Sequence, residues 1–499
     1  MKKKLILFFL TTVVLSIGYL IVQSIVKSKI STFLEQQVAK GNFTYKRTDF
    51  NFLRGNLKLS EVHFSKNDYN IASDEVEIFN FSYFKYLIHK DISVKKIKII
   101  NPIITIQKKG TTQHSISENY ENLPDIDIKK IEIEQGSVSV LKDSSEIFYI
   151  ENFTANIQEI AVDLAVLKEK IPFRHKEFDL EIKLLSYELN QLHTLSANRI
   201  SLSQKNLSVR KLQLIPKYTK QNYIEAVHVE EDLMNLTIDS LDIPEYHLSF
   251  SQDVPLFESP KIKITGADFD VYRDKTVADD PTTKDLYSKM LRELPIKLKI
   301  NNIKISDATI QYQELIKKDR QPGKVLFTNI DANIAQVTNV ALERQDFPET
   351  TVIIDSDFME ESPLRVEWRF KINDTNDFFT IKGSSHSIPQ EAINSFFIPA
   401  FNMKTEGFIN DIYFNYSGNR ETASGDFMIK YDNFIIEVLK EDRREEAGVL
   451  SWIANIFVKK SSKGNEITKH VDEVKRDETK SFWNYFWNCI QSGLVKVLI

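Results

Sequence analysis

The sequence predicts a mainly β protein with a long sheet of repeated units and a few short helices. Three observations support this prediction: an eight-residue pattern of apolar and polar residues recurs, glycine and proline are scarce, and helical periodicity is confined to short stretches. The 14 glycines and 14 prolines among 499 residues leave few of the clusters that mark linkers between domains. We therefore expect one continuous β body, over residues 43–440.

The first residues predict a membrane anchor over residues 1–26. Three lysines precede an apolar run, Leu5 to Val26, which is long enough to cross a bilayer as a helix. No small-residue cleavage motif follows, so an uncleaved signal anchor is favoured over a cleaved signal peptide. Lysines belong on the cytoplasmic side, which places the residues after about 27 outside the cytoplasm. Apolar residues at helical spacing extend the helix over residues 27–42, where Gly41 stops it.

The recurring phrase consists of two apolar residues in alternation, two polar residues, and two more apolar residues in alternation. Its six full copies are Leu57 to Phe64, Ile92 to Ile99, Ile126 to Ile133, Leu207 to Leu214, Leu236 to Ile243 and Leu298 to Ile305. Two weaker copies, Leu195 to Leu202 and Ile262 to Phe269, place alanine in one apolar position. Successive full copies start 35, 34, 81, 29 and 62 residues apart. This spacing indicates a stacked unit of about thirty to forty residues that is sometimes skipped.

The polar pair within the phrase shifts the phase of the alternation. In a regular strand the apolar residues before and after the pair would point to opposite faces. One extra residue at the pair, as at Lys95 and Lys96, would act as a β-bulge and return all four apolar residues to one face. The alternative is a two-residue hairpin, which Lys-Lys suits poorly. The bulge is therefore the favoured interpretation, and either arrangement leaves one aliphatic face and one polar face.

Two helices are expected to interrupt the β body, at about Ile157 to Lys170 and Lys284 to Glu293. Pro216 breaks the continuation of the copy that starts at Leu207, so any bend or interruption of the sheet is expected there. The last part of the body, about 400–440, again reads as strands.

Residues 441–499 are predicted to form a helical, aromatic-rich segment. Its apolar stretch Val449 to Val458 is too short to span a bilayer, and Ser481 to Ile499 is a candidate terminal helix. The aromatic residues that suit a membrane interface or a partner surface are Trp452, Phe482, Trp483, Phe486 and Trp487. The alternative is a helix that covers the open end of the sheet.

The sequence carries no recognisable catalytic motif. It has no His-Glu-x-x-His, no Gly-x-Ser-x-Gly, no Walker loop and no Cys-x-x-Cys. The nine histidines show no metal-ligand spacing, and the single cysteine, Cys489, excludes an internal disulfide framework. A net charge of -5 gives no electrostatic reason to expect nucleic acid. We expect no catalytic residues, no metal and no cofactor. An anchored periplasmic hydrolase is a separate hypothesis, which would need a clustered acid, base or metal site.

Taken together, these features resemble the AsmA-like proteins of Gram-negative bacteria, which include the TamB-type repeating β-groove proteins. The resemblance rests on three places: the anchor followed by strand patterns such as SDEVEI and VKKIKIINP between Phe50 and Ile106, the recurrence of the phrase, and the block from Gly407 to Leu439. It implies a strongly twisted sheet curled into an open groove. It also implies a single-pass inner-membrane protein with a cytoplasmic N-terminus and its bulk in the periplasm.

The same resemblance implies a non-enzymatic role in phospholipid transfer towards the outer membrane and in outer-membrane assembly. The implied partners are membrane lipids and an outer-membrane or periplasmic protein. A body of about 25 strands spaced about 4.8 Å apart would extend at most about 120 Å, so a partner or an oligomer is expected to bridge two membranes.

Two hypotheses follow for the apolar face. In the first it is an open lipid groove, and the candidate lining residues are Leu57, Leu59, Ile92, Val94, Ile126, Ile128, Leu207, Val209, Leu236, Ile238, Leu298 and Ile300. In the second the face is closed as an ordinary core, and the protein is a periplasmic scaffold or assembly factor whose C-terminal aromatic residues bind a protein partner. A continuous open face would favour the first hypothesis, and a sealed interior the second.

Overall fold

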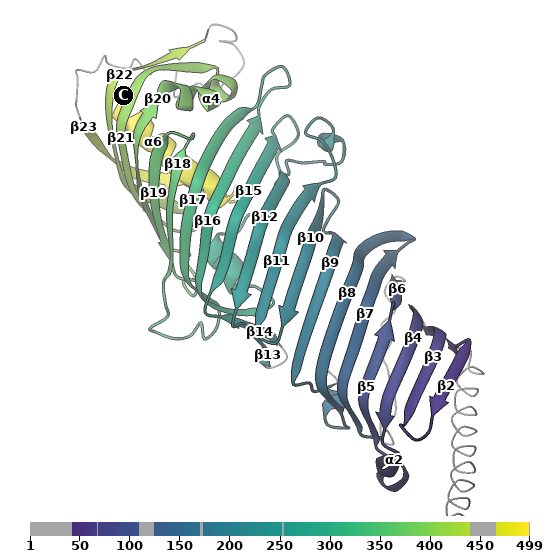
Figure 1. The fold of residues 1–499 in the computed structure, drawn as a ribbon. Helices are drawn as coiled ribbons and strands as arrows, with labels where there is room; N and C mark the ends of the chain where they lie inside the picture. The colour runs from purple at the N-terminus through teal and green to yellow at the C-terminus, as the bar shows by residue number, and fades with distance from the viewer. Residues whose placement is uncertain are drawn as a thin grey trace, which may run out of the picture. The chain divides into compact units, whose positions relative to one another are not determined.

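A computed structural model describes residues 42–66, 68–108, 124–169, 173–251, 254–439 and 466–498. Strands make up 63% of the structure and 23 of them belong to one sheet, which confirms the prediction of a mainly β fold with few short helices (Figure 1). None of the helices within these ranges is long and apolar enough to cross a membrane. The predicted anchor and nearly all of its extension over residues 27–42 lie outside the described residues.

Two compact units divide the chain, and each is described by itself. Unit 1 comprises Met1–Tyr187 and Ala197–Gln204, and unit 2 comprises Glu188–Ser196 and Lys205–Ile499. The boundary falls within strand β10 (His193–Ser203).

Unit 1 is built almost entirely from strands. Its elements are β1 (Phe43–Thr44), β2 (Arg47–Asn51), β3 (Asn56–Lys66), β4 (Tyr69–Phe81), α2 (Tyr83–His89), β5 (Ile92–Ile100), β6 (Ile103–Lys108), β7 (Ile126–Lys142), β8 (Ser145–Val162), the 3-10 helix η1 (Val166–Lys168) and β9 (Glu177–Glu188). β1 and β2 pair with β3, which is antiparallel to β4. β5 and β6 together lie between β4 and β7, antiparallel to the first and parallel to the second. β8 and β9 complete the antiparallel run.

Unit 2 continues with strands and gains most of the helices. Its elements are β11 (Asn206–Pro216), the 3-10 helix η2 (Tyr223–Glu225), β12 (Leu233–Pro244), β13 (His247–Ser251), β14 (Val254–Ser259), β15 (Ile262–Asp274), α3 (Tyr287–Arg292), β16 (Lys297–Leu315), β17 (Gly323–Thr338), β18 (Thr350–Phe358), β19 (Ser362–Phe370), β20 (Phe379–Pro389), α4 (Gln390–Phe401), β21 (Met403–Gly418), β22 (Thr422–Val438), β23 (Glu466–Lys475) and α6 (Phe482–Leu498). β15 and β16 are parallel, and from β16 to β23 successive strands pair antiparallel.

The predicted helices agree only in part with the structure. The helix expected over Lys284 to Glu293 is present as α3. The helix expected over Ile157 to Lys170 was wrong, because β8 continues through Val162 and only η1 follows. The segment 441–499, expected to be helical, contains strand β23 before α6.

The repeated phrase keeps its four apolar residues on one face, but not through an added residue. In β3 the residues Leu57, Leu59 and Val62, from both apolar pairs, pack into one cluster. The register with β4 is nevertheless unchanged across the polar pair, since Leu57 lies opposite Ile78 and Val62 opposite Ser73. The proposed bulge at the polar pair was therefore wrong for this copy.

A residue in the left-handed conformation takes the place of the bulge. In the copies at Leu57 and Leu207 the second polar residue has a positive φ, +50° at Glu61 and +50° at Lys211. In the weak copy at Ile262 the same position holds Gly266, with φ of +64°. The remaining full copies have such a residue in an antiparallel neighbour, across from the polar pair, for example Asn80 (φ 53°) beside the copy at Ile92. At this point one residue of each strand is left unpaired. The alternation of side chains between the two faces therefore shifts by one residue, while the pairing register stays the same.

The phrase also reads the same in both chain directions, which determines how copies pair. The copies at Ile92 and Ile126 are parallel neighbours, with Ile92 opposite Ile126 and each later apolar position opposite its counterpart. The copies at Leu207 and Leu236 are antiparallel neighbours, and Leu207 lies opposite Ile243. All four apolar positions match in both arrangements, because their spacing is symmetric about the polar pair.

Candidate functional site

Apolar side chains in unit 1 form rows that cross the sheet from strand to strand. Directly paired residues lie on the same face, so the register defines each row. One row runs through Leu57, Ile78, Ile97, Ile131, Ile157 and Phe178. A second runs through Leu59, Val76, Ile99, Ile133, Ala155 and Leu180. A third runs through Phe64, Ile71, Ile104, Val138, Ile150 and Leu185.

These rows lack a covering layer in the part of unit 1 that the structure describes. Most of their side chains, Ile97 and Ile131 among them, are only half-buried. Helix α2 packs against β5 but buries none of its own residues. The described strands contact mainly their neighbours in the sheet. Since a sheet face this rich in isoleucine and leucine is normally buried, the face is a candidate binding surface for an apolar ligand.

The positions that alternate with these rows carry charged residues in complementary order. Lys58 lies opposite Glu77, Glu77 opposite Lys98, and Lys98 opposite Glu132. Ion pairs join neighbouring strands, with Lys96 3.2 Å from Glu132. Contacts with Lys130 and Lys96 hold the pKa of Glu132 below its ordinary value, although partial burial opposes them. This charged face is compatible with water, whereas the opposite face carries the apolar rows.

Unit 2 carries equivalent rows on a longer run of strands. One row passes through Val209, Leu241, Ile264, Ile305, Ala332, Ile354, Val366, Gly383, Phe414 and Phe427. Another passes through Ile262, Ile303, Ile334, Val352, Trp368, Ile381 and Tyr416. Within this unit a single face of the sheet can thus be followed from β11 to β22.

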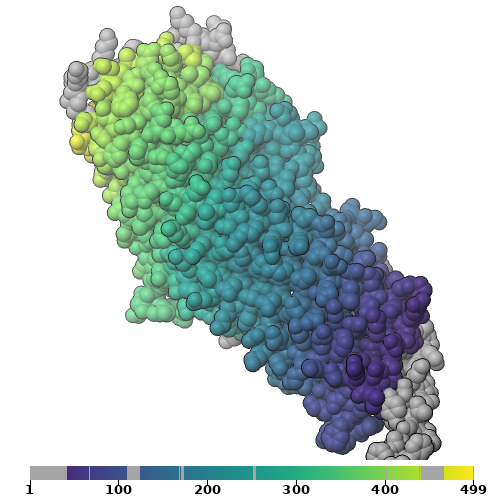
Figure 2. All heavy atoms as spheres, in the orientation of Figure 1, coloured from purple at the N-terminus to yellow at the C-terminus, as the bar shows by residue number. Residues whose placement is uncertain are grey.

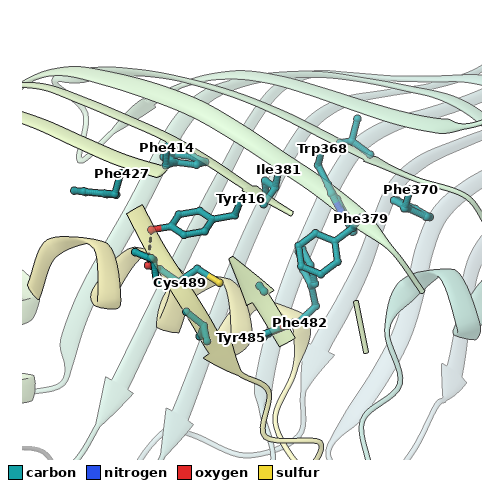
Figure 3. Close-up of a cluster of buried hydrophobic side chains, with 14 of the residues drawn as sticks. Trp368, Phe370, Phe379, Ile381, Phe414, Tyr416, Phe427, Phe482, Tyr485 and Cys489 are labelled. Carbon is teal, nitrogen blue, oxygen red and sulfur yellow. Dashed lines mark hydrogen bonds between the residues drawn. The ribbon is translucent and has the colours of Figure 1, made fainter. Parts of the chain in front are cut away.

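Helix α6 closes the C-terminal part of that face. Phe482 stacks on Trp368 with ring centroids 4.5 Å apart (Figure 3). The ring of Phe486 lies 5.3 Å from that of Phe414. The Tyr416 hydroxyl donates a 2.8 Å hydrogen bond to the Cys489 carbonyl. At Gly493 an added Cβ would lie 2.5 Å from the Phe427 ring, so the helix approaches the sheet as closely as glycine allows.

Helices α3 and α4 complete this closure. Arg292 of α3 donates to the carbonyls of Ile372 and Asp374, both at 2.8 Å. The ring of Phe396 in α4 lies 6.0 Å from Trp487, which links α4 to α6. Together the three helices and strands β16 to β23 enclose the largest apolar core among the described residues.

The other end of the same face has no such layer within the described part of unit 2. The core that includes α3, α4 and α6 does not extend to the row positions on β11 and β12. Leu212, Leu236 and Leu241 there are half-buried. One face of one unit is thus enclosed towards β22, whereas towards β11 it carries both half-buried apolar side chains and buried ones such as Val209 and Ile238. The space-filling view shows that side chains fill the spaces between neighbouring strands (Figure 2).

The structure brings several predicted lining residues together. Ile92 pairs with Ile126 and Val94 with Ile128 in unit 1. In unit 2 the candidates Val209 and Ile238 instead pair with Leu241 and Leu212, which were not among the candidates. The buried members are the third residues of their phrases, Leu59, Val94, Val209, Ile238 and Ile300. The first residues Leu57, Ile92, Leu207, Leu236 and Leu298 are half-buried, as are Ile126 and Ile128. Ile300 belongs to the enclosed core and not to the half-buried part of the face.

Sequence reasoning missed the row residues on strands that lack the phrase. These include Val76 and Ile78 on β4, Ile157 on β8, and Phe178 and Leu180 on β9. The alternation in SDEVEI and in FDLEI was a usable signal for the β4 and β9 positions.

The C-terminal aromatic residues lie mostly against the sheet. Phe482 is buried, Phe486 and Trp487 are half-buried, and Trp483 is about half exposed while its indole N–H donates to the Tyr287 hydroxyl at 3.0 Å. These contacts are those of a helix that covers the sheet, the alternative raised from the sequence. Trp452 lies outside the described residues.

In the described ranges no group of three or more His, Cys, Asp or Glu side chains is arranged to hold a metal ion. No protein-family model matches the chain, and no curated protein sequence matches it.

Proposed function

We propose that this protein is a non-enzymatic, AsmA-like lipid-transfer protein, anchored in the inner membrane by its N-terminal helix with its bulk in the periplasm. In this proposal the sheet curls into a groove whose apolar face carries the acyl chains of phospholipids towards the outer membrane. The observation that supports it is the contrast between the enclosed apolar face near β22 and the apolar rows in unit 1 that lack a described cover.

The chemistry of the rows suits acyl chains better than a polar ligand. Row positions such as Ile97, Ile99, Ile131 and Ile133 offer branched aliphatic carbon and no hydrogen-bonding group. Apolar surface buried by a ligand contributes roughly 25 cal/mol per Å², without directional contacts. A surface of this kind accepts chains of differing length, and it leaves the charged head group in water.

A photo-crosslinking comparison tests the proposal. A photoreactive amino acid is placed at Ile97, on a row in unit 1, or at the adjacent Lys98, whose side chain points to the opposite face and lies 3.0 Å from Glu134. We expect phospholipid adducts at Ile97 and none at Lys98. A third position, Ile381 beneath α6, serves as the enclosed control and should give none. Equal adduct formation at all three positions, or none at Ile97, would contradict the proposal.

A transport experiment complements the crosslinking. Replacing both Leu212 and Leu241, which are half-buried, by Asp places two charges on the apolar face of β11 and β12. We expect lipid passage to stop, while unchanged circular dichroism and limited proteolysis establish that the chain still folds. The matched control replaces the polar-face residues Ser208 and Thr237 by Asp, and transport should persist.

The second candidate function, a scaffold with a closed β core, is favoured by one observation. The enclosed core under α3, α4 and α6 is an ordinary protein interior. In our proposal the lipid path ends at this enclosed core. The scaffold hypothesis then describes this core alone. If crosslinking at Ile97 traps a protein and no lipid, the scaffold becomes the better account.

A further inference from the structure

One end of unit 1 carries a cluster of exposed apolar side chains that the proposed groove does not use. Helix α2 follows β4 at this end and projects beyond the strand ends (Figures 1 and 2). The cluster, here called the apolar tip, consists of Leu53, Phe84, Tyr86, Leu87, Ile88, Leu164 and Phe173.

The pairing register places these residues at a common end of the strands. Phe81, the last residue of β4, lies opposite Val94, and the backbone N–H of Phe81 donates to the Gly55 carbonyl in the turn that contains Leu53. Ile92 lies opposite Ile126, and Ile126 opposite Val162, which precedes Leu164. The turn after β2, helix α2 and the loop after β8 therefore belong to one edge of unit 1.

The exposure at the apolar tip is unusually high for such residues. Leu53 is 75% exposed, Phe84 70%, Leu87 69% and Ile88 57%. At the opposite end of the same strands the exposed large hydrophobic residues of unit 1 include Tyr69 and Tyr187, among charged residues such as Lys66, Lys142 and Asp143. The two ends of the unit thus differ in character.

Helix α2 is held in place by its capped ends and by Tyr83, whose ring lies 5.0 Å from that of Phe52 and 5.5 Å from that of Phe81. Ser82 caps the first turn by accepting from the Lys85 N–H, and Lys90 ends the helix in the left-handed conformation. A seven-residue helix has little stability of its own in water, and α2 buries none of its residues in the fold. The side chains of Phe84, Leu87 and Ile88 are therefore available to a surface outside the chain.

The composition of the apolar tip fits a lipid bilayer. Basic residues Arg54, Lys85 and Lys90 are interleaved with the apolar ones, so that their charged ends can reach phosphate groups while their neighbours enter the hydrocarbon. Tyr86 adds an amphipathic ring beneath the Lys90 ammonium, 5.7 Å from the ring centre. Acidic residues also lie at this end, at Asp91, Asp125 and Asp127, and Asp127 is 3.4 Å from Lys85.

The length of the chain before β1 is compatible with a bilayer at the apolar tip. β1 begins at the far end of β3, since Phe43 lies opposite Phe64, whereas the apolar tip adjoins Asn56. The eight residues from Phe64 back to Asn56 span about 27 Å of strand. The sixteen residues 27–42 span about 24 Å as the helix that the sequence predicts. The end of the anchor can therefore lie level with the apolar tip.

We infer that the apolar tip inserts into the interface of the bilayer that holds the anchor, and so seats the end of unit 1 on the membrane. The inference rests on the anchor within the proposed function, but not on lipid transport. Its occupant is the phospholipid surface; a protein covering the same residues is the competing outcome.

Site-specific fluorescence tests the inference in the full chain. An environment-sensitive fluorophore is attached at Leu87→Cys or, as a matched control at the other end of β4, at Tyr69→Cys; Cys489 is buried and stays unlabelled. The labelled chains are placed in vesicles of equal parts phosphatidylethanolamine and phosphatidylglycerol that contain acyl-brominated lipid. We expect at least a twofold loss of fluorescence at position 87 and no loss at position 69.

Three results would overturn the inference. Extraction of the chain from membranes at alkaline pH would refute the anchor, and with it both the proposed function and the apolar tip's role. An anchored chain with equal quenching at positions 87 and 69 would refute the membrane contact alone. Protection of position 87 from aqueous iodide without quenching by brominated lipid, in native membranes, would show that a protein covers the apolar tip.

Discussion

The Tyr416 hydroxyl in β21 lies 2.8 Å from the carbonyl oxygen of Cys489 in α6, so the only cysteine of the chain marks the contact between the closing helix and the sheet. Cys489 is 1% exposed, and burial raises the pKa of its thiol to about 12. Both properties make the thiol unreactive while α6 stays in place.

Replacing Phe482 by Ala should loosen α6. Phe482 is 3% exposed and stacks on Trp368, so its truncation leaves a cavity that costs about 3–5 kcal/mol. We expect the rate of maleimide labelling at Cys489 to rise by more than tenfold. The neighbouring Trp483 is 49% exposed, and Trp483→Ala should change that rate far less. Equal labelling of both variants would mean that the stack does not hold the helix.

Lys480, just before α6, should stabilise the folded chain by pairing with the buried carboxylate of Glu230. Its Nζ lies 3.3 Å from Glu230 and 3.0 Å from Asp279, and burial raises the pKa of Glu230. Lys480→Met removes the ion pair to the buried Glu230 and leaves Lys275 as the remaining cation that acts on it, which we expect to cost about 3 kcal/mol at neutral pH.

The stability that Lys480→Met loses relative to the unaltered chain should become smaller in acid. A carboxyl whose folded pKa is raised takes up its proton in the folded state first, so stability is regained as the pH falls through the folded pKa. Denaturant titrations of Lys480→Met at pH 8 and pH 5 measure the difference. The double variant with Glu230→Gln should be nearly independent of pH over this range; a deficit that persists in it would show that the lysine acts by packing alone.

Stability should depend on which residue occupies the left-handed positions at the polar pairs: alanine should lower it there, and glycine should not. Gly266 has φ of +64°, and a Cβ there would lie 2.7 Å from an Asp239 carboxylate oxygen, so Gly266→Ala should destabilise unit 2 by about 1–2 kcal/mol. Lys211→Gly, at φ of +50°, should leave the unfolding midpoint unchanged or raise it. Arg210→Gly, one residue earlier on the same strand, is the control and should lower it.

The charged face of unit 1 should lose stability in acid. The pKa of Glu132 is lowered by Lys130 and Lys96, so its contribution is complete above the ordinary value of 4.5 and is lost as the pH falls through the lower folded pKa. Glu132→Gln should therefore flatten the fall in stability between about pH 5 and pH 3. An unchanged slope in thermal melts over this range would show that these ion pairs do not contribute.

The sequence predicted the mainly β class because the phrase marks strands whose apolar residues all face one way. It located β3, β5, β7, β11, β12, β15 and β16 directly. It did not locate β23, where only Ile467, Val471 and Val474 are apolar in a charged segment and the partner strand β22 supplies the context.

The erroneous helix over Ile157 to Lys170 has a similar cause. Ile157 and Ile160 are spaced as on a helix, yet Ile157 lies between Ile131 and Phe178 in a row of the sheet. Tertiary pairing overrides the local pattern there. The contact of α6 with β21 joins residues far apart in the sequence, such as Tyr416 and Cys489, which are 73 positions apart, and no local pattern can reveal it.

The symmetry of the phrase about its polar pair bears on how such a protein can change in size. A duplicated copy finds matching apolar positions on its neighbour whether a hairpin or a crossover connects them. Each added copy lengthens the sheet by about 4.8 Å and leaves both faces as they were. The span of the molecule is therefore a quantity that gene duplication can adjust in small equal steps, without any new pairing rule.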